Sequence, residues 1–195
     1  MANSAPATRP AHSTLLRTLA IFLLALILLV AIAVIVIWLA VKPKKLVYTI
    51  ESGSIHNYNL TNNHLNATFN FELRAYNPNS RVSIYYDRIE STVYYDDQTL
   101  AVNSLQPFHQ PKRNVTRLNL NFVSTNVELF PGVAKNLQME KMSREVELEI
   151  RVKAKIRFKV GAVKNHRTLR LLCAPVVVPF SSSKSFERTP CDIDL

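Results

Sequence analysis

The feature that most constrains this chain is an unbroken apolar run of 23 residues, from Leu19 to Val41. As a helix that rises about 1.5 Å per residue, the run would be about 34 Å long, slightly more than the ~30 Å hydrocarbon core of a bilayer. Arg17 and Lys42 flank the run, and Trp38 lies where an interfacial aromatic anchor is expected. A cleaved signal peptide would have a shorter apolar region, of roughly 7–15 residues. We therefore expect a single transmembrane helix that the mature chain retains, with a cleaved signal peptide as the alternative.

The charges beside this segment do not give its orientation. Two basic residues and the amino terminus precede the segment, and three basic residues follow it: Arg9, Arg17, Lys42, Lys44 and Lys45. The positive-inside rule compares these two groups, which are nearly equal. The orientation therefore has to come from other features of the chain.

Two features beyond the apolar run suit an oxidising compartment. Three Asn-x-Thr triplets are possible glycan acceptors, and they begin at Asn59, Asn66 and Asn114. Asn, Ser and Thr are common enough in this chain to produce such triplets by chance. The two cysteines, Cys173 and Cys191, could close a disulfide that stabilises the fold by roughly 3 kcal/mol. Two buried reduced thiols are the equal alternative.

The dominant pattern after the apolar run is the alternation of apolar and polar residues, which is typical of strands with one buried face. It is clearest from Leu65 to Tyr76, after which Asn77-Pro78-Asn79 breaks the strand. The run from Glu145 to Val160 is the longest, and we expect a bend or a broken ladder near its change from acidic to basic residues. Seven strands are predicted, at residues 65–76, 82–86, 91–95, 115–122, 145–160, 169–180 and 191–195.

One helix is expected to interrupt the strands. Ser124-Thr125-Asn126 offer side-chain oxygens for an N-cap, and Pro131 fits an early helical turn. Phe130, Val133 and Leu137 would share one face of this helix. Seven strands with short linkers and one helix predict a mainly β fold, an antiparallel two-sheet sandwich behind the N-terminal helix.

No residue pattern in the chain is typical of an enzyme. The three glycines are far apart, which excludes a glycine-rich phosphate loop. Asp96 and Asp97 form a carboxylate pair, but they lie in a predicted turn, where Asp is favoured for its conformation. The five histidines and two cysteines lack the spacing of metal ligands. We therefore expect no catalytic residue, no cofactor and no metal.

A basic stripe is the feature that predicts binding. Five basic residues alternate with apolar ones along the longest predicted strand and so share one face: Arg151, Lys153, Lys155, Arg157 and Lys159. Such a face attracts the anionic groups of lipids, acidic polysaccharides or nucleic acids. Nucleic acid is not expected, because aromatic residues for base stacking do not share this face and the chain carries a membrane segment. The alternative is a solvated outer face that Glu145 to Glu149 partly neutralise.

Three motifs, in this order, resemble a known plant family. The first is Tyr76-Asn77-Pro78-Asn79, followed by Ile84-Tyr85-Tyr86-Asp87 and Tyr94-Tyr95. The second is Pro107-Phe108-His109-Gln110 with Lys112, Asn114 and Thr116, and the third is Arg157-Phe158-Lys159-Val160-Gly161 with Cys173 and Cys191. The chain resembles the harpin-induced-like proteins, which are related to the non-race-specific disease resistance protein and carry a late-embryogenesis-abundant group 2 domain. It differs from the family pattern at Ser83, Pro111 and Arg113.

The resemblance implies a fibronectin-like sandwich at the plasma membrane, with a cytosolic amino terminus and an extracellular, glycosylated and disulfide-bonded domain. It also implies a non-enzymatic role in plant defence against pathogens, including the hypersensitive response, through adhesion or assembly of a signalling complex. The expected partners are the lipid bilayer and either cell-wall polysaccharide or other membrane defence proteins. The alternative is a protein that protects against desiccation-type stress, with a cytosol-facing domain. Four parts are expected: a cytosolic tail at 1–17, a signal-anchor helix at 18–41, a linker with the first strand at 42–62, and the late-embryogenesis-abundant group 2 sandwich at 63–195.

Overall fold

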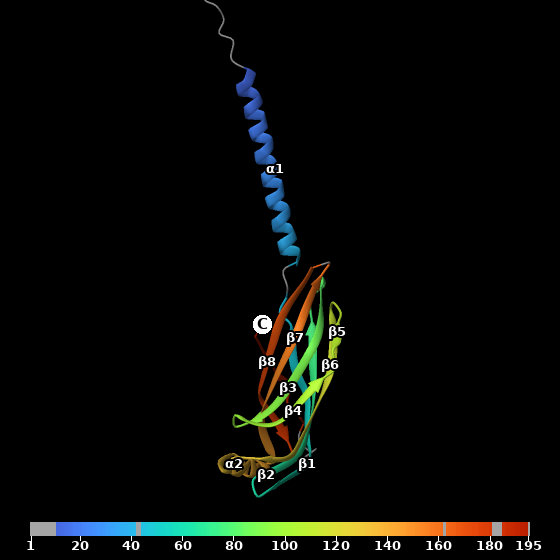
Figure 1. Cartoon of the computed structure of the whole chain (residues 1–195), viewed down its shortest axis with the longest axis vertical. Coiled ribbons are helices and arrows are strands. Elements are labelled where there is room, and N and C mark those ends of the chain that lie inside the picture. Colours follow the sequence, from blue (N-terminus) through green and yellow to red (C-terminus); the bar gives the residue numbers. More distant parts are fainter. Residues whose placement is uncertain (1–10, 42–43, 162, 181–184, 195) are drawn as a thin grey trace, which may run out of the picture. The chain divides into compact units, whose positions relative to one another are not determined.

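Figure 1 shows the computed structural model, which describes residues 11–41, 44–161, 163–180 and 185–194. The chain divides into two compact units, Met1–Lys42 and Pro43–Leu195. The first unit contains helix α1, Ala11–Val41, and the second contains all the described strands together with helix α2, Pro131–Ser143. Arg9, which precedes the predicted membrane segment, and Lys42, which follows it, lie outside the described residues, as does the side chain of Trp38.

Helix α1 covers the predicted membrane segment at 18–41 and begins earlier, at Ala11. Its side chains from Leu16 to Val36 are exposed, and a helix that is apolar on all sides requires an apolar environment such as a bilayer. The segment Leu16–Val36 is long and apolar enough to cross a membrane, with a mean hydropathy of 3.5. A signal sequence near the amino terminus can pass the same test of length and composition, although its apolar region is usually shorter. The helix is therefore either a membrane anchor or a signal sequence.

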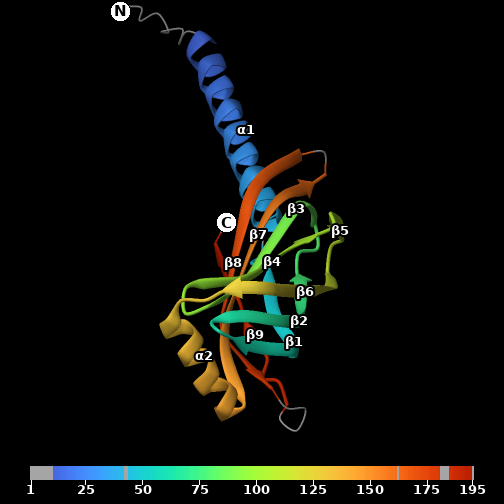
Figure 2. The same cartoon turned by 60° about the horizontal axis from the view of Figure 1, so that its bottom comes forward.

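Two antiparallel sheets form a β-sandwich in the second unit (Figures 1 and 2). The four-stranded sheet has the order β6-β2-β1-β9, with bounds Asn114–Glu128, His64–Asn77, Val47–Thr61 and Thr189–Pro190. The six-stranded sheet has the order β10-β8-β7-β3-β4, with bounds Asp192–Asp194, Val163–Pro179, Glu145–Val160, Val82–Tyr95 and Gln98–Leu105. Strand β5, Phe108–Gln110, also pairs with β3. Helix α2 connects the two sheets between β6 and β7 (Figure 2).

The core lies between the two sheets and follows the alternation read from the sequence. In β2, every second residue from Leu65 to Leu73 is at most 3% exposed, whereas the residues that alternate with them are half-buried or exposed. The same alternation buries Leu148 and Ile150 in β7. Each such side chain contributes roughly 1.5–3 kcal/mol by leaving water. The predicted mainly β sandwich is confirmed.

The predicted number of seven strands is wrong, because ten strands occur among the described residues. The two runs expected at 82–86 and 91–95 belong to one strand, β3. A β-bulge between Tyr86 and Arg88 leaves Asp87 and Arg88 both exposed, and this interrupts the alternation without ending the strand. Strands β4, β5 and β9 were not predicted. In β4, Leu100 and Ala101 are both buried, so the period of two is lost there as well.

The N-cap expected at Ser124-Thr125-Asn126 is also wrong, because these three residues belong to β6. Ser124 is buried and its hydroxyl donates a hydrogen bond of 2.8 Å to the carbonyl of Leu100. Helix α2 begins instead at Pro131 and has no side-chain cap. Proline at the first helical position has no N–H, so it removes one of the unpaired donors at this end of the helix.

Strand β7 runs unbroken from Glu145 to Val160, and its pairing is irregular near the change of charge, as expected. The register with β8 shifts between Leu148 and Ile150, on either side of Glu149. The register with β3 shifts further along, opposite the bulge at Asp87. These bulges allow a strand of 16 residues to remain paired on both sides in a twisted sheet.

Candidate anion-binding face

The five predicted basic residues lie on the outer face of the six-stranded sheet, and we call this set the β7 basic face: Arg151, Lys153, Lys155, Arg157 and Lys159. The residues between the first four, Val152, Ala154 and Ile156, are at most 3% exposed and point into the core. Arg151, Lys153 and Lys155 are exposed, and the last two basic residues are half-buried. The alternation of one strand therefore aligns five cations on the solvent side.

Two members of the β7 basic face are already paired with carboxylates. Arg157 donates a hydrogen bond of 2.7 Å from Nε to Oδ2 of Asp87, which is exposed by the bulge in β3. Arg151 contacts the carboxylate of Glu149 on its own strand, and its guanidinium lies 4.4 Å from the ring centre of Tyr94. The hydrogen bonds to these carboxylates raise the pKa of both arginines. Both arginines are therefore largely neutralised by near neighbours.

The three lysines of the β7 basic face form no ion pair within the described part of the chain. Lys155 faces Arg88 on β3, and Lys159 faces Lys164 on β8. Only Lys153 has an acidic residue directly opposite, Glu90, and the carboxylate of Glu90 lies 4.0 Å from Arg88. The lysines thus carry the positive charge of this face.

Three hollows are lined by members of the β7 basic face. The largest, of about 600 Å³, has Arg151 and Lys153 beside Tyr94 and Leu172, and it also contains the acidic residues Glu90, Asp192 and Asp194. The second, of about 450 Å³, has Lys155 beside His166, Arg167 and Arg170. The third, of about 430 Å³, has Lys159 and Lys112. The first hollow is mixed in charge, whereas the other two are mainly basic.

Several residues that extend this face were not assigned from the sequence. The β7–β8 pairing places Lys164 opposite Lys159 and Arg170 opposite Lys153, so β8 adds a second basic row. The tight turn at Gly161 between two alternating runs is the signal that would have given this register. No sequence pattern indicates that the carboxylate of Asp87 neutralises Arg157, because Asp87 lies in a bulge of β3, 70 residues away in the sequence.

The three possible glycan acceptors lie on the four-stranded sheet. Asn59 and Asn66 are exposed and face each other across the β1–β2 pair, and Asn114 is half-buried at the start of β6. The hydroxyl of Thr61 donates a hydrogen bond of 2.9 Å to the side-chain oxygen of Asn59. The side-chain oxygen of Asn66 accepts one of 2.8 Å from the backbone nitrogen of Asn126. The acceptor asparagines of the first two triplets are thus on the surface.

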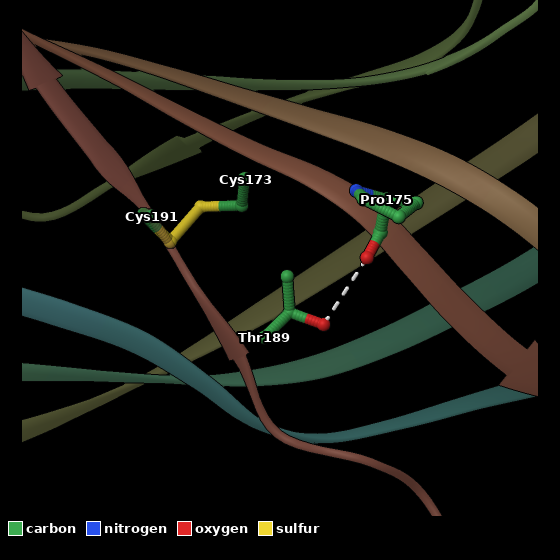
Figure 3. Close-up of a disulfide and its surroundings, with 4 residues drawn as sticks. All are labelled: Cys173, Pro175, Thr189 and Cys191. Carbon is green, nitrogen blue, oxygen red and sulfur yellow. Dashed lines mark hydrogen bonds between the residues drawn. A yellow bond between two sulfur atoms is a disulfide. The ribbon is translucent and has the colours of Figure 1, made fainter.

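Cys173 and Cys191 are joined by a disulfide, which links β8 to the segment between β9 and β10 (Figure 3). Cys173 is fully buried at 0% exposure. Next to the bridge, the hydroxyl of Thr189 donates a hydrogen bond of 3.3 Å to the carbonyl of Pro175 (Figure 3). The bridge therefore fastens the carboxyl end of the chain to the sandwich.

The carboxylate pair Asp96 and Asp97 lies in the turn between β3 and β4, as the sequence predicts. Both residues are exposed and have positive φ angles of 49° and 58°. Asp tolerates this left-handed conformation, which accounts for the pair. Within the described residues, no group of three His, Cys, Asp or Glu side chains could hold a metal ion.

The first two motifs that carry the family resemblance contribute three buried amide side chains. Asn77, Asn79 and Gln110 are at most 5% exposed. Each of them forms hydrogen bonds with the backbone of a different strand or loop. A buried amide that satisfies several backbone groups is costly to replace, which explains why these residue types mark the fold.

The fold and this face define the class of the protein. It is a β-sandwich that follows an N-terminal apolar helix and has basic residues on the outer face of its six-stranded sheet. Residues 72–173 match the model of a family described as late embryogenesis abundant protein. The chain is 31% identical over 181 residues to NDR1/HIN1-like protein 3 of Arabidopsis thaliana, covering 88% of this chain and 78% of that protein.

Two further relatives from Arabidopsis thaliana agree with this match. NDR1/HIN1-like protein 10 is 29% identical over 182 residues, covering 88% of this chain and 80% of that protein. An uncharacterized protein is 33% identical over 169 residues, covering 84% of this chain and 76% of that protein. The chain therefore belongs to the NDR1/HIN1-like family with a late embryogenesis abundant domain, and the resemblance read from its motifs is confirmed.

Proposed function

We propose that this chain is a non-enzymatic, single-pass plasma-membrane protein of plant defence, whose extracellular sandwich binds an acidic ligand. The family relationship supports a role in defence or stress. The finer assignment rests on the β7 basic face, which is the observation that carries the proposal. The mechanism is adhesion or assembly: α1 holds the domain at the membrane, and the face engages an acidic cell-wall polysaccharide or an acidic partner.

The central lysines of the face are the residues that would bind this ligand. Lys153 and Lys155 are exposed and in no ion pair of the described residues, so their charges are available to a ligand. Arg151 and Arg157 would have to exchange a carboxylate of the protein for one of the ligand. The lysines should therefore contribute more to binding than the two arginines, although the sequence pattern treats all five alike.

Two observations support an extracellular position of the domain. The disulfide between Cys173 and Cys191 is of the kind that persists in oxidising compartments. Asn59 and Asn66 are exposed, so an oligosaccharide at either residue would extend into solvent without disturbing the core. Both features agree with the topology that the family resemblance implies.

The topology is tested by the electrophoretic mobility of the membrane-expressed protein with and without N-glycosidase. A variant that lacks all three acceptors, Asn59→Gln, Asn66→Gln and Asn114→Gln, is the control. A shift that this variant abolishes supports the extracellular domain. Empty triplets together with free thiols at Cys173 and Cys191 would instead favour the cytosol-facing stress protein.

The binding role is tested by retention of the full chain, in detergent, on immobilised polygalacturonate at increasing salt. The Lys153→Gln/Lys155→Gln variant should elute at lower salt than the parent, because attraction between exposed charges is screened. Lys135→Gln/Arg188→Gln removes the same charge from exposed residues elsewhere on the sandwich and is the matched control. Equal elution of the two variants would refute a role of the β7 basic face.

A further inference from the structure

A second basic surface lies at the end of the sandwich where the chain enters it, and we call it the basic end. Four stretches of the chain, 44–48, 76–84, 108–116 and 158–166, contain no Asp or Glu. Together they contain seven basic residues: Lys44, Lys45, Arg81, Lys112, Arg113, Lys159 and Lys164. Of these only Lys159 also belongs to the β7 basic face.

Hydrogen bonds of Asn79 bring two of these stretches to the start of the domain. The backbone nitrogen of Lys44 donates a bond of 2.7 Å to the side-chain oxygen of Asn79, whose side-chain nitrogen donates one of 3.0 Å to the carbonyl of Lys44. The backbone nitrogen of Arg113 donates a bond of 3.0 Å to the carbonyl of Asn79. Asn79 thus holds the entry of the chain and the loop after β5 together.

Asn77 and strand pairing bring in the remaining stretch. The side-chain nitrogen of Asn77 donates bonds of 2.9 Å to the carbonyl of Val82 and 3.0 Å to that of Pro111. Ser83, next to Val82, pairs with Lys159 at the end of β7. The buried asparagines of the first family motif therefore assemble the four basic stretches at one end of the fold.

The charges of the basic end are available for a ligand. Within the described residues, none of its seven basic side chains is in an ion pair. All are exposed except Lys159, which is half-buried. Several cations without nearby anions produce a positive potential that attracts anionic groups.

The basic end also has a hollow suited to an anionic headgroup. It has a volume of about 430 Å³ and is lined by Lys112 and Lys159 together with Ser83, Tyr85, His109, Pro111 and Gly161. The rings of Tyr85 and His109 stack with centres 4.2 Å apart and form a rigid part of its lining. Two ammonium groups around a hollow of this kind suit a phosphate group.

We propose that the basic end binds the anionic phospholipid headgroups of the bilayer that contains α1, with one phosphate in the hollow. The reason for a lipid rather than a soluble anion is the connection of the chain, since Lys44 is the third residue after the last residue of α1, Val41. The contact rests on the retained span of the proposed function, but not on the orientation of that span. It would fix the sandwich against the membrane and leave Lys153 and Lys155 free for another ligand.

The experiment uses the full chain in nanodiscs of phosphatidylcholine, with or without roughly one third phosphatidylglycerol. A water-soluble acylating reagent modifies lysines, and peptide mass spectrometry gives the rate at each one. At low salt we expect acylation of Lys112 and Lys159 to be roughly tenfold slower with the anionic lipid, because several charges act together on the docked state. Lys135 on α2 is the internal reference, whose rate should not change.

Two variants separate this proposal from the proposed function. Lys112→Gln/Arg113→Gln should restore the rate at Lys159 in anionic nanodiscs, whereas Lys153→Gln/Lys155→Gln should leave the slowing intact. Equal rates at Lys112 and Lys159 in the two lipids would overturn the proposal, even if polygalacturonate binding is confirmed. Loss of the protein from the discs with a shortened mass would show that α1 is a cleaved signal, which refutes the span itself.

Discussion

The hydroxyl of Tyr48, on β1, lies 2.6 Å from the hydroxyl of Tyr86, on β3, and so joins the two sheets through the core. The Tyr86 hydroxyl also donates a bond of 3.0 Å to the side-chain oxygen of Gln110. The side-chain nitrogen of Gln110 in turn donates one of 2.8 Å to the carbonyl of Ala75 on β2. Four strands are thus linked by one buried chain of hydrogen bonds, each member of which is satisfied.

This chain of hydrogen bonds predicts a loss of stability at alkaline pH. Burial raises the pKa of Tyr86 to about 12 and that of Tyr48 well above its usual value. In the unfolded chain a tyrosine loses its proton near pH 10, so above about pH 10 the folded state holds protons that the unfolded state releases. The free energy of unfolding is therefore unaffected by these groups below about pH 10. Between about pH 10 and 12 it falls by about 1.4 kcal/mol per pH unit for each such tyrosine.

Urea unfolding followed by circular dichroism at several pH values measures this slope. Tyr48→Phe/Tyr86→Phe should lower stability at pH 8, because Gln110 loses its partner, yet make the decline above pH 10 shallower. Tyr58, whose burial raises its pKa to about 12, leaves part of the decline in place. A variant that declines as steeply as the parent would contradict the assignment to this pair.

We expect the removal of the buried Asn77 amide to lower the stability of the fold strongly. Asn77→Ala leaves the carbonyls of Val82 and Pro111 without their bonds, and it removes the acceptor of the backbone nitrogen of Asn79. Unsatisfied buried groups cost about 1–3 kcal/mol each, so we expect a loss of roughly 3 kcal/mol in the free energy of unfolding. Asn119→Ala, at an exposed position of β6, is the matched control and should change it by less than about 0.5 kcal/mol.

Two glycines should respond to alanine in opposite directions. A Cβ atom on Gly53 would lie 2.7 Å from a ring carbon of Phe186 and 2.9 Å from the ring of Phe71, so Gly53→Ala should destabilise by about 1–3 kcal/mol. Gly132, in α2, has no atom within 4 Å of that position, so Gly132→Ala should stabilise by up to about 1 kcal/mol. Thermal unfolding of both variants measures the pair. Equal unfolding midpoints of the two variants would contradict the prediction, because they would show that the ring of Phe186 moves away from the new methyl group without cost.

The disulfide predicts a loss of stability under reducing conditions. Cys173 and Cys191 lie 18 positions apart in the sequence, and a closed loop of this size stabilises the fold by roughly 3 kcal/mol because it restricts the unfolded chain. A reductant should therefore lower the midpoint of urea unfolding of the parent but not that of the Cys173→Ala/Cys191→Ala variant. A parent insensitive to reductant after full thiol release would show that the bridge adds nothing to stability.

The sequence predicted the parts of the fold that one buried face dictates. Strands β2 and β7 were found because their alternation places every second residue in the core. Strand β3 was divided in two because the bulge at Asp87 breaks that period, and a bulge depends on the partner strand rather than on local propensity. The predicted N-cap at Ser124 was wrong because it also depended on another strand: the hydroxyl of Ser124 donates its hydrogen bond to the carbonyl of Leu100 on β4.

The site was predictable only in outline. Five basic residues on one face follow from alternation, but their pairing does not, because Asp87 and Asp97 reach Arg157 and Arg151 from 70 and 54 residues away. The basic end is likewise assembled from four distant stretches by Asn77 and Asn79. The alternation of apolar and polar residues along a strand predicts which residues face outward. Which charges remain without partners depends on the topology of the sheets.

The pairing of Arg157 with Asp87 gives a prediction in which binding increases. Asp87→Asn removes the carboxylate that neutralises Arg157, so under the proposed function the β7 basic face gains a cation. An exposed pair contributes about 0.2–1 kcal/mol, so stability should change little while retention on polygalacturonate rises, by roughly two- to fivefold in affinity at low salt. The double variant Asp87→Asn/Arg157→Gln restores the original charge of the face and should bind like the parent. If the double variant keeps the gain although its net charge equals that of the parent, the gain comes from the loss of the Asp87 carboxylate itself and Arg157 has no place in the face.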